Sequence, residues 1–547
     1  MDYKDLAELI FPDAKDISYY EEKYPRWDLP EEAVVTRFAP SPTGYVHIGG
    51  LYQCVLESVL TKRTNGVLLL RVEDTDQKRE VENGVAGIVN SLKNFDIEYD
   101  EGLISETDEK GNYGPYKQSL RGDIYQAYAK YLIAQGKAYP CFATPEELEE
   151  LRAKQEAAKI RPGYYGVWAK YRNLTVEEAA EKIKNGEDYV VRFKSPGRED
   201  RKIKHKDVIK GNIEFPENDL DIVIIKGDGL PTYHFAHVVD DHLMRTTHVI
   251  RCDEWVSSIP IHLQLFYEMG FKAPKYAHYA PIMKDDEGKK RKISKRKDPE
   301  AAVEFYYKEG IPSQSVKEYL LNIANSTFEN WRRANPDKSI DEFDFQLNKM
   351  SVSGALFDMV KLLDLSKNVI SKYSAERVYD EAMAWANEFD KELADMLSAD
   401  KEYSLRVLGI ERGNAKPRKD LSKWSELKYT ISYMYNDKFD KNAEFEYAKV
   451  TDKDEIAKIT KLYVEKYFDI NDDKQTWFDK MKDLAEEVGF AREVKEYKAE
   501  PEKWPGHVGD ISTGNSCYFN RKTKHTRFIW NYASFRKRYC CWQIKLI

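Results

Sequence analysis

The sequence predicts an α/β fold with a parallel sheet, split by an α+β insertion and followed by mostly α-helical domains. Three observations predict it: a strand–helix–strand pattern near the N-terminus, a change to alternating strands between residues 113 and 232, and amphipathic helical patterns from Pro299 to about residue 500. A chain of 547 residues is too long for one hydrophobic core, so we expect three or more domains.

The first pattern is a βαβ unit. Two β-rich runs, Ala33–Phe38 and the near-continuous apolar Val67–Val72, flank a helix that closes at Asn65-Gly66. A continuous apolar run is typical of a strand buried on both faces in a parallel sheet, and the crossover should be right-handed. The apolar face of the helix consists of Leu51, Val55, Val59 and Leu60.

The second pattern predicts an insertion that splits this sheet. It contains two helices, the second with a proline start and an acidic first turn, and three strands, after which the sheet resumes. The helices are expected at Leu120–Gln135 and Pro145–Lys159, the strands at Tyr189–Lys194, Asp207–Phe215 and Leu220–Lys226, and the resumed sheet at His248–Arg251.

Two segments carry most of the chemical information. The first, Arg37-Phe-Ala-Pro-Ser-Pro-Thr-Gly-Tyr-Val-His-Ile-Gly-Gly50, predicts a strand end, a Pro-rich turn and a glycine-flanked histidine at a helix start. Backbone N–H groups and the positive end of a helix dipole then meet at one point, which suits a phosphate. The second, Lys292-Ile-Ser-Lys-Arg296, offers cations that can stabilise charge on a leaving pyrophosphate.

Together, and in this order, the two segments resemble the HIGH and KMSKS signatures of class I aminoacyl-tRNA synthetases. The turn Ala39-Pro-Ser-Pro-Thr-Gly44 resembles that of bacterial-type glutamyl-tRNA synthetases. Four more segments match the family in order, namely Arg71-Val-Glu-Asp-Thr-Asp76, Gly114-Pro-Tyr-Lys-Gln-Ser119, Leu230-Pro-Thr-Tyr-His-Phe-Ala236 and Val239-Asp-Asp-His-Leu-Met244. The resemblance implies a Rossmann-type catalytic domain that uses ATP and Mg²⁺ to activate glutamate and load it onto the terminal adenosine of tRNA.

The resemblance also implies roles for individual residues near ATP. His47 would contact phosphate oxygens in the transition state, and Lys292, Lys295 and Arg296 would stabilise the pyrophosphate. Taken alone, His47 reads as a histidine that caps a helix, and the lysines as part of a solvated basic loop. The implied ATP-binding residues are Gly44, His47, Gly49, Gly50, Glu254 and Lys295, with Gly49 and Gly50 leaving room for an adenine ring.

Glutamate has two carboxylates and one ammonium, so its pocket should offer arginines and one acid. A guanidinium fork matches a carboxylate with two parallel hydrogen bonds. By resemblance, Arg37 and Arg251 take the carboxylates and Glu73 takes the ammonium. The other implied members of the glutamate pocket are Ala39, Ser41, Tyr233, His237 and Trp255.

Some positions depart from the family pattern. His237 stands where some relatives have Asn, Cys252 where a Gly or Ala is usual, and Arg245 where Gly is common. Some relatives hold zinc in the insertion through clustered Cys and His. Here Cys141 stands alone and Ala143 takes the place of a second Cys, so four-ligand spacing is absent and we predict no metal site of the protein's own.

The resemblance implies a division into domains. The expected order is an N-terminal extension (1–30), the first half of the catalytic domain (31–112), an acceptor-stem-binding insertion (113–232), the second half of the catalytic domain (233–280), a stem-contact domain with the lysine loop (281–370) and a helical anticodon-binding domain (371–547). The insertion also contains a basic stretch that suits contact with RNA, namely Lys194, Arg198, Arg201, Lys202 and Lys204.

The expected partners are L-glutamate and tRNA(Glu), with tRNA(Gln) left open as a further substrate. A net charge of −8 does not exclude RNA, because RNA binding needs a local basic face rather than a basic total. No apolar run approaches a membrane span, and six cysteines without paired spacing fit a reducing compartment. We expect a cytoplasmic monomer.

Two alternative functions stay open at this point. A glutaminyl-tRNA synthetase is disfavoured by Ser41, because those enzymes usually carry a Pro-Glu-Pro type of turn there. A non-catalytic tRNA-binding paralogue is disfavoured by the intact His47 and Lys295. Charging assays separate the three.

The last segment of the chain, 514–547, differs in texture from the rest. The final 35 residues hold no Asp or Glu, eight Lys or Arg, and three of the six cysteines. One interpretation is a basic, aromatic RNA-binding tail. We prefer the hypothesis of a one-base frameshift, because one choice of synonymous codons read one base later gives a peptide that resembles the family's C-terminus. Sequencing the gene region tests it.

Overall fold

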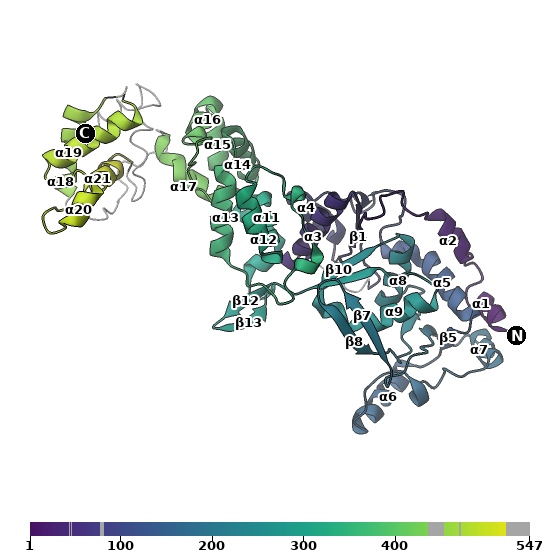
Figure 1. The fold of residues 1–547 in the computed structure, drawn as a ribbon. Coiled ribbons are helices and arrows are strands. Elements are labelled where there is room, and N and C mark those ends of the chain that lie inside the picture. The colour runs from purple at the N-terminus through teal and green to yellow at the C-terminus, as the bar shows by residue number, and fades with distance from the viewer. Residues whose placement is uncertain (43, 45, 77–80, 436–452, 470–471, 521–547) are drawn as a thin grey trace. The chain divides into compact units, whose positions relative to one another are not determined.

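The computed structural model describes the chain except for residues 43, 45, 77–80, 436–452, 470–471 and 521–547. The chain divides into two compact units, Met1–Leu365 and Ser366–Ile547, whose elements Figure 1 labels in chain order. Most of the predicted anomalous tail, residues 521–547, lies outside the described residues, so the frameshift hypothesis stays a prediction.

The first unit is built on the predicted βαβ unit. Strand β1 (Val35–Phe38) and strand β2 (Val67–Leu70) are parallel, with Val35 opposite Val67, and helix α3 (Ile48–Thr64) connects them. Asn65 ends α3 in the left-handed conformation at φ 50°, which Asn tolerates better than most residues. The prediction of a parallel α/β unit at the N-terminus is confirmed.

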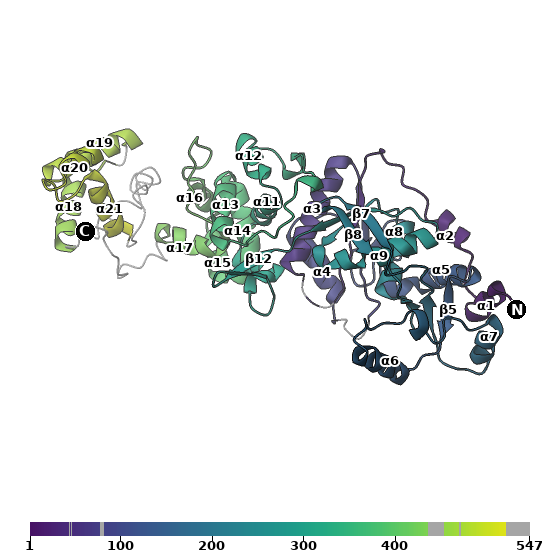
Figure 2. The ribbon, with the colours of Figure 1, turned by 60° about the horizontal axis from the view of Figure 1, so that its bottom comes forward.

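After the insertion, a second pair of parallel strands lies beside β1. Strand β10 (His248–Cys252) pairs in parallel with β11 (Lys275–Tyr279), and the backbone N–H of Thr247 donates to Val35 O at 2.9 Å. The strand predicted near His248–Arg251 is therefore present, but it belongs to a two-stranded sheet of its own beside the four-stranded sheet that contains β1 and β2. Helices α8 (Tyr233–Leu243) and α9 (Ile259–Glu268) flank it, as the two views show (Figures 1 and 2).

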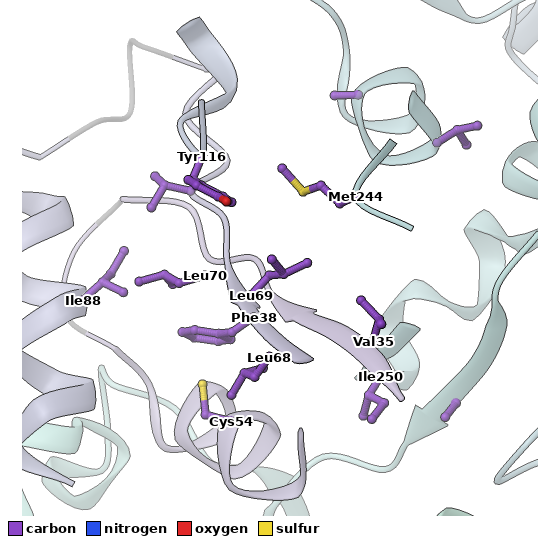
Figure 3. Close-up of a cluster of buried hydrophobic side chains, with 14 of the residues drawn as sticks. Val35, Phe38, Cys54, Leu68, Leu69, Leu70, Ile88, Tyr116, Met244 and Ile250 are labelled. Atoms are coloured by element: carbon purple, nitrogen blue, oxygen red, sulfur yellow. The ribbon is translucent and has the colours of Figure 1, made fainter. Parts of the chain in front are cut away.

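The position of these strands in the core explains why their residues are mostly apolar. All four residues of β1 and all four of β2 are buried, because helices cover the sheet. Figure 3 shows the side chains that meet there, among them Val35, Phe38, Cys54, Leu68, Leu69, Leu70, Ile88 and Ile250. A charged residue in such a strand must find partners inside the protein, since an isolated buried charge is very costly.

The insertion holds two antiparallel pieces. The first is a three-stranded sheet in the order β5-β6-β9, and the second is the hairpin β7–β8, which lies against β11 because Val208 N donates to Tyr276 O at 2.8 Å. The bounds are β5 (Ala138–Cys141), β6 (Val190–Phe193), β7 (Lys202–Asp207), β8 (Gly211–Pro216) and β9 (Val223–Ile225), with helices α5 (Gly122–Ala134), α6 (Pro145–Ala157) and α7 (Val176–Lys184).

One predicted strand, Asp207–Phe215, is wrong. The chain reverses there, so that β7 ends at Asp207 and β8 begins at Gly211. The Asp207 carboxylate accepts the backbone N–H groups of Ile209 and Lys210, each at 2.9 Å, and Gly211 has φ +74°. A side chain that caps its own turn, followed by a glycine in the left-handed region, favours reversal over extension.

The N-terminal extension folds onto the insertion. Helix α1 (Tyr3–Ile10) packs on α5 and α7, and helix α2 (Ile17–Lys23) packs on α5. Beyond α2, the Tyr24 hydroxyl donates to Gly114 O at 2.7 Å, and the Trp27 indole N–H donates to Met244 O at 3.0 Å. Residues 1–30 are therefore an integral layer of the first unit.

The rest of the chain is mostly helical, as predicted. The first unit is completed by α4 (Gly84–Asn94), β3 (Glu101–Leu103), β4 (Glu109–Lys110), β12 (Met283–Asp286), β13 (Lys289–Lys292), α10 (Val303–Glu309), α11 (Ser313–Ala324) and α12 (Thr327–Ala334), and α13 (Met359–Ser371) leads into the second. The second unit contains α14 (Ala375–Phe389), α15 (Lys391–Ser398), α16 (Lys401–Gly409), α17 (Leu427–Ile431), α18 (Lys453–Leu462), α19 (Lys474–Glu487), α20 (Val494–Ala499) and α21 (Val508–Asn520).

Among the residues that the structure describes, no helix is long and apolar enough to cross a membrane.

Candidate functional site

His47 begins helix α3. It has extended backbone angles, and its Nδ1 accepts the backbone N–H of Gly49 at 3.0 Å, so it is the helix N-cap. The predicted capping role is thus correct. The cap also defines the ring chemistry, because a neutral imidazole whose Nδ1 accepts must carry its proton on Nε2.

The lysine loop lies next to His47. Ala302 forms an isolated bridge with His47, and Val303 N donates to Val46 O at 3.1 Å. Burial lowers the pKa of His47 to about 4, and the charges of Lys295 and Lys292 act in the same direction. The structure therefore brings the two signature segments together although about 240 residues separate them, and His47 is neutral near pH 7.

The loop is shaped by Asp298. The guanidinium of Arg291 donates to both Asp298 oxygens at 2.6 and 2.8 Å, and the backbone N–H of Ser294 donates to Oδ2 at 2.9 Å. Lys292 at the end of β13 pairs with Glu254, Nζ to Oε2 2.6 Å. Lys292, predicted for the pyrophosphate, and Glu254, predicted for ATP, are therefore in direct contact, while Lys295 and Arg296 are exposed on the loop.

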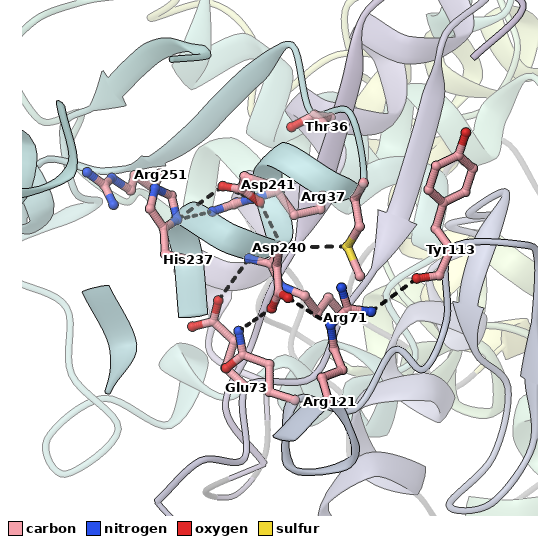
Figure 4. Close-up of polar contacts among 12 residues, drawn as sticks. Thr36, Arg37, Arg71, Glu73, Tyr113, Arg121, His237, Asp240, Asp241 and Arg251 are labelled. Carbon is pink, nitrogen blue, oxygen red and sulfur yellow. Dashed lines mark hydrogen bonds and ion pairs between the residues drawn. The ribbon is translucent and has the colours of Figure 1, made fainter. Parts of the chain in front are cut away.

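A buried ionic cluster lies where β1, β2 and α8 meet. Arg37 Nε donates to Asp241 Oδ1 at 3.0 Å, and Arg71 Nη1 donates to the same oxygen at 2.7 Å. Arg71 Nη2 also donates to Glu73 Oε1 at 3.1 Å. Figure 4 shows Arg37, Arg71, Glu73 and Asp241 in this cluster. Burial works against the charged carboxylate, but the two guanidinium groups hold the pKa of Asp241 below its ordinary value.

Asp240 extends the cluster on the next position of α8. It accepts from Arg121 Nε at 2.7 Å, from Gln118 Nε2 at 2.8 Å and from the Tyr125 hydroxyl at 2.8 Å. Its Oδ2 lies 3.7 Å from Arg71 Nε. Buried charges are tolerated only when they are paired and hydrogen-bonded, so α8 fixes Arg37 of β1 and Arg71, which follows β2.

Arg251 in β10 is linked to this region through Tyr233 and His237. Its Nη1 donates to the Tyr233 hydroxyl at 3.1 Å and its Nη2 to Trp255 O at 3.3 Å. The Tyr233 ring packs against the Trp255 ring at 4.6 Å and the His237 ring at 6.0 Å between centroids. His237 in turn lies 3.5 Å from Arg37, Nδ1 to Nη2. The structure therefore gathers the predicted glutamate residues of β1, α8 and β10 into one region.

Glu73 has an environment suited to a cation. Burial raises the pKa of its carboxyl above the ordinary value, although Arg71 and Arg37 act in the opposite direction. A positive group placed beside Glu73 would therefore favour its ionised form. Glu73 N donates to Pro40 O at 3.0 Å, which joins it to the loop that carries Ala39 and Ser41.

The glycines of the first segment have different constraints. Gly44 has φ +129°, a conformation that side chains rarely adopt. A Cβ on Gly50 would approach Val46 at 3.3 Å and Phe38 at 3.4 Å, and one on Gly49 would approach His47 Nδ1 at 3.3 Å. Both are thus explained by local packing, and room for an adenine ring stays a prediction. Ala39 is half-buried and Ser41 exposed on the loop after β1, and their part in glutamate binding stays a prediction.

Sequence reasoning assigned no role to several residues that build the site. Arg71, Asp240, Asp241 and Arg121 are each 2% or less exposed, and they position the predicted groups. The available signal was charge in an apolar setting, since Arg71 follows four apolar residues of β2 and the two aspartates sit inside α8 beside Val238 and Val239.

The described residues hold no group of three or more His, Cys, Asp or Glu side chains placed to bind a metal ion. Cys141 is buried among Tyr139, Tyr164 and Ala169, where it packs as a small apolar residue. The absence of zinc stays a prediction.

Fold and site together define a class I tRNA synthetase. The family model for tRNA synthetases class I (E and Q), catalytic domain, matches residues 33–364. The chain belongs to this glutamate and glutamine (E and Q) family.

Several glutamate–tRNA ligases are similar to this chain over nearly its whole length. A glutamate–tRNA ligase of Clostridium perfringens (strain SM101 / Type A) is 52% identical over 515 residues, which cover 94% of this chain and 93% of the relative. One from Clostridium beijerinckii is 48% identical over 516 residues, with 94% and 93% covered. The crystal structure of a glutamate tRNA ligase from Elizabethkingia meningosepticum in complex with its amino acid has a TM-score of 0.67 at 26% identity, covering 92% of this chain and 100% of that one.

Proposed function

We propose that this protein is a glutamate–tRNA ligase that activates L-glutamate with ATP and transfers the glutamyl group to tRNA(Glu). The observation that carries the choice of substrate is the set of charged side chains in this region. Arg37 lies beside His237, Arg251 donates to the Tyr233 hydroxyl, whose ring packs on that of His237, and Glu73 is paired with Arg71. Two guanidinium groups and one carboxylate complement the two carboxylates and one ammonium of glutamate.

The reaction needs positioning rather than a protein nucleophile. An oxygen of the glutamate α-carboxylate forms a bond to the α-phosphorus of ATP, and the bond to the bridging oxygen breaks to release pyrophosphate. A ribose hydroxyl of the terminal adenosine then attacks the acyl carbon, loses its proton and releases AMP. Orientation and electrostatic stabilisation can supply most of the rate.

His47 and the lysine loop are proposed to act on the phosphates. The N-cap bond makes Nε2–H the donor of neutral His47; the backbone of Ile293 in the lysine loop holds this donor, and a phosphate oxygen would replace it. Lys292, Lys295 and Arg296 supply charge for the pyrophosphate. The Lys292–Glu254 ion pair is largely exposed, and exposed pairs contribute about 0–1 kcal/mol. ATP phosphates can therefore take Lys292 from Glu254 and leave that carboxylate to the ribose. Magnesium would enter with the ATP phosphates.

For tRNA, we propose binding regions rather than individual residues. The insertion would hold the acceptor end, and the helical second unit the anticodon. Within the basic stretch, Lys202 pairs with Glu214 at 2.7 Å, Arg201 with Glu217 at 2.8 Å and Arg198 with Asp200 at 2.6 Å. These are exposed pairs that phosphates can replace, since phosphate contacts exchange readily with other ions.

Charging of purified tRNA(Glu) and tRNA(Gln) with labelled glutamate, in the presence of ATP and Mg²⁺, tests the proposal. Charging of tRNA(Glu) alone would establish a discriminating ligase, and charging of both a non-discriminating one. Labelled glutamine serves as the competing substrate. Charging with glutamine instead, or binding of tRNA by a folded protein without any charged product, would overturn the proposal.

A further inference from the structure

Arg251 is held from behind by two buried residues on other elements. Its Nε donates to His278 Nε2 at 2.9 Å, and His278 Nδ1 lies 2.6 Å from Asp207 Oδ2. Arg251 belongs to β10, His278 to β11 and Asp207 to the end of β7 in the insertion. Asp207 is 1% exposed and His278 is not exposed at all, so water does not compete for these bonds.

The order of donors and acceptors along this chain is determined by chemistry. A guanidinium has only donors, so His278 Nε2 must accept from Arg251. The imidazole then carries its proton on Nδ1 and donates it to Asp207. A second proton would turn Nε2 into a donor that faces Arg251. Burial lowers the pKa of His278, and the charge of Arg251 acts in the same direction, which keeps the ring neutral.

We infer that Asp207 and His278 are positioning residues that aim the Arg251 guanidinium at the carboxylate of the amino-acid substrate. With Nε anchored on His278, the plane of the guanidinium is set, and its two Nη atoms lie toward Tyr233 and Trp255. A misaligned fork cannot make two parallel bonds to a carboxylate. Because Arg251 is assigned to glutamate under the proposed function, this role rests on that function.

Asp207→Asn gives a selective way to disturb the chain of bonds. Asp207 Oδ1 accepts the backbone N–H groups of Ile209 and Lys210 at 2.9 Å each. An asparagine would keep its oxygen toward these two donors and toward the backbone N–H of His278, which lies 3.3 Å from Oδ1, and its NH₂ group would face His278 Nδ1. That nitrogen must then accept, so the proton moves to Nε2, where it opposes the Nε–H of Arg251. The side-chain shape is retained while the tautomer is inverted.

The test compares steady-state charging of tRNA(Glu) by the full-length wild type and four variants: Asp207→Asn, His278→Phe, the double variant, and Asp221→Asn. Asp221 is the matched control, a fully buried carboxylate of the insertion that bonds the Tyr139 hydroxyl at 2.7 Å and Ser195 N at 2.9 Å. Its structural bonds do not involve Arg251 or His278. The KM for glutamate, the KM for ATP, kcat and the thermal midpoint are measured for each protein.

Asp207→Asn should raise the KM for glutamate by about 10- to 100-fold, the order expected for a misplaced substrate-binding group, with the KM for ATP nearly unchanged. His278→Phe should raise the same constant. In the double variant there is no tautomer left to invert, so adding Asp207→Asn to His278→Phe should change the KM for glutamate little. Asp221→Asn should lower the thermal midpoint and leave the KM for glutamate near that of the wild type.

Three outcomes would overturn the inference. One is an unchanged glutamate KM in Asp207→Asn. Another is the same factor for Asp207→Asn with and without His278, which would indicate a purely structural turn. The third is an equal rise for Asp207→Asn and the Asp221→Asn control. If His278→Phe does not fold, the comparison of Asp207→Asn with the control still decides. A wild type that charges no tRNA with glutamate would instead overturn the proposed function.

Discussion

His47 shows how one side chain serves the fold and the chemistry at the same time. Its Nδ1 accepts from Gly49 N, which satisfies one of the N–H groups that a helix start leaves unpaired. The same bond places the proton on Nε2, and the pKa of about 4 keeps the ring neutral. Capping and phosphate contact are therefore compatible roles.

Two substitutions separate these roles. In His47→Asn, the amide oxygen can replace Nδ1 as the cap while the Nε2–H donor is lost. We expect a thermal midpoint close to that of the wild type and a fall in kcat of about 10²- to 10³-fold, as for loss of one transition-state donor. His47→Ala should lose about 1 kcal/mol of stability as well.

Thermal unfolding and charging of tRNA(Glu) at saturating ATP measure both effects. Full activity of a stable His47→Asn variant would leave His47 with the capping role alone.

Glu57 gives a second prediction at this scale. Its carboxyl is fully buried in α3, accepts from Gln53 at 2.9 Å, and has its pKa raised to about 8 by burial. The folded protein thus holds a proton that the unfolded chain releases near 4.5, so the stabilisation is present below that pH and is lost as the pH rises toward 8. The slope approaches about 1.4 kcal/mol per pH unit.

Glu57→Gln removes the titrating group and keeps its shape. Relative to the wild type, the variant should gain stability as the pH rises from 5 to 8. Unfolding midpoints at both pH values measure the difference, and Glu329→Gln, an exposed glutamate paired with Arg333, is the control without this trend. Parallel pH curves for the wild type and Glu57→Gln would show that Glu57 is ionised in the fold.

At the scale of elements, the N-terminal extension is clamped to the end of α8. Arg245 follows α8 with φ +59°, which explains why glycine is common at this position in the family. Its Nε donates to Tyr24 O at 3.0 Å and its Nη2 to Glu21 Oε2 at 3.0 Å. His242 lies 2.7 Å from Glu21 Oε1. Arg245 therefore adopts a strained backbone conformation, and its contacts with the extension offset that strain.

Two substitutions separate the stabilisation by the side-chain contacts of Arg245 from the cost of its left-handed backbone. Arg245→Ala loses the clamp and keeps the left-handed backbone, whereas Arg245→Gly loses the clamp and removes the strain. We expect both variants to be less stable than the wild type, because both lose the clamp. The free energy of unfolding of Arg245→Ala should be about 1 kcal/mol lower than that of Arg245→Gly. Thermal midpoints at one pH rank them. Equal stability of the two variants would contradict backbone strain at this residue.

At the scale of the whole molecule, the chain divides into two units between residues 365 and 366. This division separates the residues assigned to bind ATP and glutamate from most of the C-terminal helices. All residues assigned to ATP or glutamate lie in the first unit. The proposed anticodon-binding region, 371–547, lies in the second, so its loss should affect tRNA rather than the small substrates.

A shortened chain of residues 1–370 tests this division. Its affinity for ATP and glutamate should match that of the full-length protein. Its KM for tRNA(Glu) should rise by about 10- to 100-fold or more, because losing one of two linked binding regions removes their joint effect. Calorimetric binding of the small substrates and charging kinetics with tRNA give the two values. An unchanged KM for tRNA would place the anticodon contacts elsewhere.

The sequence by itself determined the parts of this protein that depend on local pattern. The apolar run Val67–Val72 predicted β2, the Asn65-Gly66 pair predicted the end of α3, and the two signature segments predicted the chemistry, because propensity, burial and motif spacing are written along the chain. The strand expected at Asp207–Phe215 failed because the Asp207 side chain caps its own turn, a local bond that an alternating pattern does not reveal.

Only the tertiary structure decided which charges meet. Asp241 and Arg37 are separated by 204 residues, and Asp207 and His278 by 71, so nothing in either neighbourhood marks the partner. The N-terminal extension likewise gained a purpose only when Glu21 and Tyr24 met Arg245. Burial supplies the physical reason: a charge enclosed by a folded chain must be paired by whatever residue the topology brings to it, and that residue is set by the whole fold.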